Sequence, residues 1–158
     1  MFYSQANNLI PDDPTATNDV FLRDMQSGSV SLVSSTAAGE NIDAGSVFPR
    51  ISPNGKVVSF LSKGLDPNDT NNFSGIYVKE LSSGNIERID IGLGNTHANN
   101  NARHSDLSED GSIVVFDTRA NNLVPGGVDT NNANDIYMHN RNTGVTQLIS
   151  KNLSLIHI

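Results

Sequence analysis

This 158-residue sequence lacks several features that direct proteins to particular functions. It contains no cysteine, which excludes disulfide bonds, zinc–thiolate sites and thiol catalysis. Lys and Arg number 10 against 17 Asp and Glu, and nothing basic is clustered, so neither a nucleic-acid partner nor an anionic membrane partner is expected. No apolar run approaches the roughly 20 residues of a membrane span, and residues 1–5 lack the basic and apolar regions of a signal peptide.

What the sequence does contain is a repeated turn followed by a strand. Residues 108–116 read Ser-Glu-Asp-Gly-Ser-Ile-Val-Val-Phe, and residues 52–60 read Ser-Pro-Asn-Gly-Lys-Val-Val-Ser-Phe. Serine suits the first position of a type I turn and glycine the last, while the β-branched run that ends in phenylalanine is typical of a buried strand. Phe60 and Phe116 are 56 residues apart (116 − 60 = 56). A period of this length predicts a repeat architecture.

Two further segments recur with a similar period. The apolar segments Val20–Leu22, Ile76–Val78 and Ile136–Met138 follow one another at offsets of 56 (76 − 20) and 60 (136 − 76). Residues 6–11 (Ala-Asn-Asn-Leu-Ile-Pro) match residues 120–125 (Ala-Asn-Asn-Leu-Val-Pro), which places Phe2 in register with the phenylalanine of the other two copies. The chain thus holds three copies of one unit, and the first copy lacks its opening strand.

Each copy carries four strand signals, and none shows a sustained helical periodicity. In the middle copy we expect strands near Val47–Ile51, Lys56–Leu61, Ile76–Leu81 and Ile86–Ile91. A short glycine-containing turn joins the last two strands, and a long loop rich in Asn, Asp and Pro, at 62–75, joins the middle two. Four antiparallel strands per unit, repeated without a helix between them, are typical of a β-propeller.

The repeated motif resembles that of one known family. Ser52–Phe60 and Ser108–Phe116 look like the S-P-D-G-x-x-ϕ-ϕ-F motif of WD40-like PD40 repeats, which build TolB-type β-propellers. Asn134–Tyr137 (Asn-Asp-Ile-Tyr) is similar to the third strand of these repeats, whereas the middle copy has Ser74-Gly75 in place of Asn-Asp. The resemblance covers nearly the whole chain up to about Ser150. It implies an exported protein, periplasmic or extracellular, that binds other molecules.

We therefore expect an all-β fold: a β-propeller fragment of about three blades of four antiparallel strands, with the first blade incomplete. Residues 1–45 form the partial first blade and a linker, 46–101 the second blade, 102–150 the third, and 151–158 a tail outside the repeat, all in one propeller domain. Because a propeller closes with about four to eight blades, we expect a piece of a longer chain that supplies the remaining blades, or else an assembly of several copies.

In a propeller the first strand of each blade is innermost and lines the central channel. Arg50 lies in the expected first strand of the second blade, and His104 and Asp106 lie in that of the third. These residues form the predicted polar wall of a channel that contacts a ligand or peptide. The alternative is a polar wall that is only solvated.

A second candidate site lies in the connection at 129–135, which reads Asp-Thr-Asn-Asn-Ala-Asn-Asp. Asp129, Asn131 and Asp135 offer oxygen ligands at alternate positions, as a hard cation such as calcium requires. Against calcium, the segment has no glycine for a sharp turn and no closing glutamate. The alternative is that these side chains cap turns through local hydrogen bonds. Calcium is the one cofactor that the sequence suggests.

Three classes of function remain open. The leading class is a non-enzymatic binding or scaffold propeller, which contacts a protein or a small ligand through its loops and channel. The alternatives are an accessory propeller of a larger hydrolase or peptidase, and a propeller lyase with a catalytic channel. The sequence contains no G-x-S-x-G nucleophile elbow, and no two of its carboxylates are placed as an acid–base pair. The binding class is placed first because the resemblance to TolB-type propellers implies it.

Overall fold

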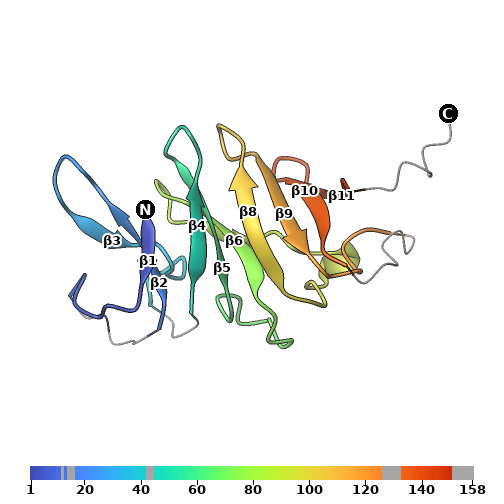
Figure 1. Cartoon of the computed structure of the whole chain (residues 1–158), viewed down its shortest axis with the longest axis horizontal. Helices are drawn as coiled ribbons and strands as arrows, with labels where there is room; N and C mark the ends of the chain where they lie inside the picture. Colours follow the sequence, from blue (N-terminus) through green and yellow to red (C-terminus); the bar gives the residue numbers. More distant parts are fainter. Residues whose placement is uncertain (12, 14–16, 42–44, 126–132, 151–158) are drawn as a thin grey trace.

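The computed structural model describes residues 1–11, 13, 17–41, 45–125 and 133–150. These residues form three antiparallel sheets that follow one another along the longest axis of the molecule (Figure 1). The first sheet holds β1 (Phe2–Ser4), β2 (Asp19–Arg23) and β3 (Val30–Leu32). The second holds β4 (Val47–Ile51), β5 (Val57–Ser62), β6 (Gly75–Glu80) and β7 (Ile86–Arg88). The third holds β8 (Ala102–Leu107), β9 (Ile113–Thr118), β10 (Asp135–Asn140) and β11 (Val145–Leu148).

The four strands expected in the middle copy are all present. β4 has the expected bounds, β5 and β6 are each displaced by one residue, and β7 ends at Arg88, where the sequence predicted a strand to Ile91. The first sheet has no counterpart of β4, as expected, because β1 pairs Phe2 with Phe21 in the way that β5 pairs Phe60 with Tyr77. A short 3-10 turn, η1 (Leu93–Asn95), precedes β8. Among the described residues no helix is long and apolar enough to cross a membrane.

The repeated motif forms the turn that the sequence predicts. Ser52 Oγ accepts a hydrogen bond from the Val57 N–H at 3.0 Å, and Ser108 Oγ accepts one from the Ile113 N–H at the same distance. The glycine of each turn has a φ of 72°, in the left-handed region that only glycine enters without strain. The serine and glycine are therefore structural residues of the motif.

Turns of neighbouring blades touch each other. The Asn54 N–H donates a hydrogen bond to the Glu109 carbonyl at 3.2 Å. A Cβ built on Gly111 would lie 2.6 Å from side-chain carbons of Val57, well inside van der Waals contact. Gly111 is thus required twice, for its positive φ and for the close approach of the second blade to the third.

Apolar side chains fill the spaces between the sheets. The cluster between the first and second sheets comprises Val20, Val33, Val58, Phe60, Leu65 and Tyr77. The larger cluster between the second and third sheets includes Val57, Leu61, Ile76, Val78, Ile89, Val114, Phe116, Tyr137 and Leu148. All six residues of β5 are buried, because that strand has a sheet on each side. Burial of this apolar surface is the main stabilising contribution to the stack.

A buried lysine also joins the first blade to the second. Lys79 Nζ, on β6, donates to the Val33 carbonyl at 3.1 Å, the Ser35 carbonyl at 3.0 Å and Ser35 Oγ at 2.6 Å. Burial lowers the pKa of Lys79, since no carboxylate lies among these acceptors. The three acceptors match the three N–H bonds of an ammonium group, so the contact is fully satisfied.

One apolar face of the third sheet is open to solvent. Val115 on β9 and Ile136 on β10 are each 39% exposed. Their counterparts in the second sheet, Ser59 and Ile76, are completely buried. The open face is therefore the one that, in the second sheet, packs against the following blade.

Candidate functional site

The first strands of the second and third sheets, β4 and β8, lie beside each other, and β1 lies on the other side of β4 (Figure 1). Arg50 on β4 and His104 and Asp106 on β8 line one shallow pocket of about 270 Å³. The rest of the lining is Ser105, Val115, Phe116, Asp117 and Ile136. The structure thus brings together the three residues predicted as a channel wall. We call this depression the β4–β8 pocket.

Asp117, on β9, fixes the orientation of His104. Its Oδ1 lies 3.0 Å from His104 Nδ1 and accepts a hydrogen bond from the His104 backbone N–H, also at 3.0 Å. A proton on Nδ1 satisfies this carboxylate and leaves Nε2 as a hydrogen-bond acceptor. The imidazole is 63% exposed, so Nε2 faces solvent. Sequence reasoning missed Asp117, although one signal marks it: an acid at the strand position where the middle copy has Leu61.

Arg50 and Asp106 occupy equivalent positions, each two residues before the serine of its turn. Arg50 Nη1 donates to the Pro49 carbonyl at 3.1 Å, and Asp106 Oδ1 accepts from the Leu107 N–H at 2.9 Å. Within the described part of the chain neither side chain forms an ion pair. The pocket therefore presents a cation and an anion on adjacent strands, and both charges remain free to meet a ligand.

An aromatic row borders the pocket, formed by Tyr3, Phe48 and His104. The Phe48 ring centroid lies 5.6 Å from that of His104 and 5.9 Å from that of Tyr3. Phe48 has a φ of 53°, where the pairing of β4 with β5 shifts register between Val47 and Arg50. A bulky residue with positive φ stores strain of about 1–3 kcal/mol and is frequent at functional sites. Composition and spacing carry no sign of this strain, so the sequence did not predict the row.

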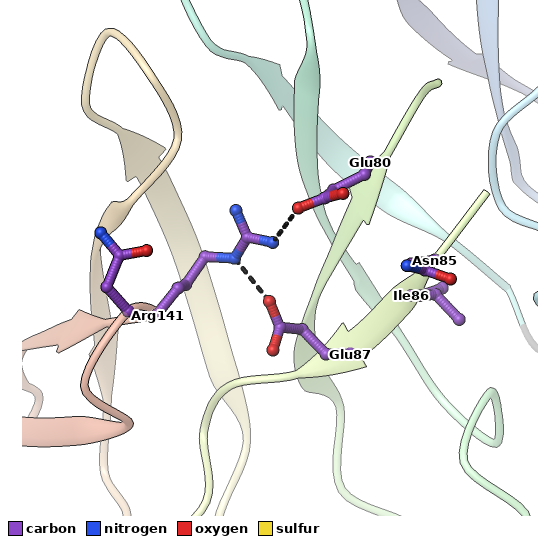
Figure 2. Close-up of a pocket in the computed structure, with 6 residues that line it drawn as sticks. Glu80, Asn85, Ile86, Glu87 and Arg141 are labelled. Atoms are coloured by element: carbon purple, nitrogen blue, oxygen red, sulfur yellow. Dashed lines mark hydrogen bonds and ion pairs between the residues drawn. The ribbon is translucent and has the colours of Figure 1, made fainter. Parts of the chain in front are cut away.

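A second pocket, of about 340 Å³, lies between the second and third blades (Figure 2). Arg141 reaches across it, with Nη2 3.0 Å from Glu80 Oε1 and Nε 2.5 Å from Glu87 Oε1. Its Nη1 donates to the Gly111 carbonyl at 3.0 Å. Burial opposes the charge, but the hydrogen bonds to Glu87 and Glu80 raise the pKa of Arg141. Since all three guanidinium nitrogens bind protein groups, we assign this pocket to the joint between the blades.

The predicted calcium segment is only partly described. Asp129 and Asn131 lie outside the described residues. Asp135 begins β10 and is buried, and its Oδ1 accepts a hydrogen bond from Ser150 Oγ at 2.5 Å. Asp135 Oδ2 and Asn134 Oδ1 are buried and have no hydrogen-bond partner in the described part of the chain. No three His, Asp or Glu side chains among the described residues are grouped to hold a metal ion. The calcium site stays a prediction.

Comparison with known proteins decides the fold. The sequence matches no protein-family model and no curated protein. The structure resembles the putative TolB from Agrobacterium tumefaciens with a TM-score of 0.55 at 17% identity, covering 87% of this chain and 39% of that one. It resembles the β-propeller domain of the Trilobed protease from Pyrococcus furiosus with a TM-score of 0.54 at 16% identity, covering 86% and 35%. This chain has a β-propeller fold.

The propeller also resembles TolB from Acinetobacter baumannii, with a TM-score of 0.50 at 17% identity, covering 85% of this chain and 27% of that one. The chain thus spans between about a quarter and two fifths of these structures. The predicted all-β, TolB-like propeller is confirmed as a fold, with three sheets of three, four and four strands. At such identities the likeness carries the fold alone.

Proposed function

We propose that this propeller is a non-enzymatic binding module, which contacts a protein or a small ligand at the β4–β8 pocket. The observation that carries the proposal is the meeting of Arg50, His104 and Asp106 there, with two charges that no described protein group neutralises. A ligand that carries both a hydrogen-bond donor and an anionic group fits this arrangement. His104 Nε2 and Asp106 accept from the donor, and Arg50 pairs with the anion.

The serine of the pocket supports binding rather than hydrolysis. Ser105 follows His104 directly on β8, and successive strand residues point to opposite faces. Its hydroxyl is buried and lies 2.9 Å from the hydroxyl of Ser59, from the neighbouring blade. His104 instead bonds Asp117 and borders Phe48. The imidazole and the hydroxyl therefore do not form a nucleophile–base pair.

A selection experiment tests this proposal on the whole chain. The immobilised protein is panned against a random peptide library, and a set of amino acids, short peptides and sugars is tested by thermal shift. We expect ligands whose binding falls at least tenfold with Arg50→Ala or Asp106→Ala and is kept with Lys56→Ala, a matched change on an exposed turn. If every ligand obtained is indifferent to both pocket variants, the β4–β8 pocket is not the binding site.

An accessory role in a larger peptidase is the second candidate, and export to the periplasm or cell exterior accompanies both. The peptidase role is favoured by the resemblance to the propeller domain of the Trilobed protease. Determining the complete reading frame in the source DNA separates the candidates. Continuation into an α/β-hydrolase domain with a G-x-S-x-G elbow supports the peptidase role. A leader with basic and apolar regions supports export. A complete reading frame that contains neither the hydrolase domain nor the leader supports a binding protein inside the cell.

A further inference from the structure

The second blade contains a buried charge network formed by Asp69, Arg88 and Asp90. In the first and third blades an aspartate begins the strand equivalent to β6 and accepts a hydrogen bond from a serine. Asp19 accepts from Ser34 at 2.9 Å, and Asp135 accepts from Ser150 at 2.5 Å. In the second blade Gly75 occupies the aspartate position and Asp90 occupies the serine position. The acid therefore stands where the other two blades have serine. This exchange is the physical reason why the middle copy has Ser74-Gly75 in place of Asn-Asp.

An arginine accompanies the exchange. Arg88 stands where the other blades have leucine, and its Nε and Nη2 donate to Asp90 Oδ1 at 2.8 Å and Oδ2 at 3.2 Å. Its Nη1 pairs with Asp69, from the loop between β5 and β6. A Cβ at position 75 would fall on the guanidinium, so Gly75 makes room for it. Burial opposes the charge, but hydrogen bonding to Asp90 raises the pKa of Arg88.

The network holds more acids than bases. The side chains of Asp69, Arg88 and Asp90 are only 2%, 1% and 0% exposed, so two carboxylates face one guanidinium out of water. Burial raises the pKa of Asp69, but the Asn71 N–H and the Arg88 charge outweigh burial and hold it below its usual range. A buried excess negative charge is costly unless another cation lies against it.

His97 supplies that cation in its protonated form. Its Nδ1 lies 3.4 Å from Asp69 Oδ1 and its Nε2 3.0 Å from Asp66 Oδ2, and its side chain is 14% exposed. Both ring nitrogens therefore face carboxylate oxygens. Only an imidazolium donates at both positions, whereas a neutral imidazole turns one lone pair toward a carboxylate.

We propose that His97 is a pH-sensitive clamp on the β5–β6 loop, Ser62–Gly75. When His97 is protonated, it holds Asp66 and Asp69 of this loop against the connection between β7 and β8. When it loses its proton, the attraction to the two carboxylates is lost, one ring nitrogen turns a lone pair toward a carboxylate, and the loop opens more often. Several contacts of the loop remain in both states, among them the Asp69–Arg88 ion pair and the hydrogen bonds from Asn71 Nδ2 to the Ala98 carbonyl at 2.9 Å and from the Asp66 N–H to Tyr77 Oη at 3.2 Å. The opening is therefore local.

Asp90 is the other titratable acid at the centre of this network, and burial raises its pKa; it contacts Arg88 and Ile76 rather than His97, so the His97 variants below separate the two groups. Histidine titrates between about pH 5 and 8. Arg88 stays protonated there, and burial raises the pKa of Tyr77 to about 12. The loop lies outside the β4–β8 pocket, so the clamp does not depend on the proposed binding function. Because surface loops carry many protein contacts, any partner that reads the Ser62–Gly75 loop binds in a pH-dependent way.

Amide hydrogen exchange of the whole chain tests the clamp. Protection factors of residues 66–73, corrected for intrinsic exchange, are measured at about pH 5.5 and about pH 8, on either side of the histidine range. We expect protection of this loop to be about tenfold higher at the acidic pH, since the attraction between the imidazolium and the two carboxylates is lost on deprotonation. The strands β5 and β6 should keep the same protection at both values.

Variants separate His97 from the other histidines. His97→Gln should abolish the difference, His97→Lys, a permanent cation, should keep the loop protected at both pH values, and the matched control His139→Gln should respond as the unaltered protein does. Equal protection of the loop at both pH values in the unaltered protein overturns the proposal, and so does a difference that survives in His97→Gln. The first measurement needs no variant, so a misfolded mutant does not leave the clamp undecided.

Discussion

Replacing Arg88 by the leucine of the other two blades removes the centre of the buried network. The Arg88→Leu change leaves Asp90 and Asp69, whose side chains are 0% and 2% exposed, without their guanidinium partner. Removing one partner of a buried ion pair costs about 3–5 kcal/mol, because the remaining charge is desolvated and unpaired. We therefore expect the free energy of unfolding to fall by about that amount, which lowers the midpoint by about 6–20 °C for a domain of this size.

The other blades show how to repair this loss. Adding Asp90→Ser and Gly75→Asp to Arg88→Leu rebuilds the aspartate–serine pair of the first and third blades. The guanidinium that blocks a Cβ at residue 75 is then absent. Replacing a buried ionic arrangement by a satisfied one of similar volume is often nearly neutral. The triple variant should therefore recover at least half of the stability that the single variant loses.

Urea unfolding followed by circular dichroism measures both effects. We expect the unaltered chain to be the most stable, the triple variant to follow, and Arg88→Leu to be the least stable. Gly75→Asp alone should be strongly destabilising, because its side chain meets Arg88. A loss below about 1 kcal/mol for Arg88→Leu, the value of an exposed pair, would refute the view that this network is buried and coupled. If the triple variant is no more stable than Arg88→Leu, the aspartate–serine pair of the first and third blades cannot replace the charge network of the second.

Four other perturbations follow from the same contacts. Hydrogen bonds from Ser112 and Ser108 lower the pKa of Asp110 to about 2. Its contribution to the free energy of unfolding is therefore present above pH ~4, the pKa of an unfolded aspartate, and is lost as pH falls toward 2. The melting temperature of Asp110→Asn, which copies Asn54 of the second blade, should depend less on pH between these values. Lys79→Met removes three buried hydrogen bonds between the first and second blades and should cost about 1–3 kcal/mol in urea unfolding; an unchanged midpoint would contradict its role between the blades. The open face of the third sheet should make the chain self-associate, and Ile136→Lys should lower the mass seen by light scattering; equal masses would mean that another surface associates. Calcium at 129–135 should raise the melting temperature at millimolar concentration when magnesium does not; identical curves would remove the calcium prediction.

The spacing of the repeated motifs was enough to predict the sheets and to place Arg50, His104 and Asp106 on neighbouring strands. Arg50 and Asp106 precede equivalent turns, so placing two copies of the repeat side by side puts both residues on first strands. This equivalence accounts for the presence of Arg50 and Asp106 on neighbouring strands, whereas the part of the lining from β9 and β10 does not follow from it. Repeats make such predictions possible because the position of one residue in its unit fixes the position of its counterpart.

Contacts that depend on loop path or on backbone strain were not predictable in the same way. His97 and Asp66 meet only because the β5–β6 loop folds back across the connection after β7. The strained φ of Phe48 comes from a shift of strand register, which no local composition signals. The Gly75 departure was visible in the sequence, but its cause became clear only with the position of Arg88.

The contact between neighbouring turns has a consequence for the width of the β4–β8 pocket. Val57 and Gly111 meet without room for even a Cβ, so a side chain at residue 111 would have to displace the second blade from the third at this point. The pocket is lined by Arg50 of the second blade and by residues of β8, β9 and β10 of the third, including Val115 and Ile136 of the open face. A larger side chain at residue 111 would therefore open the angle between the two blades and spread Arg50 from Asp106. Gly111, which the turn requires for its positive φ, would in this way also affect the width of the β4–β8 pocket.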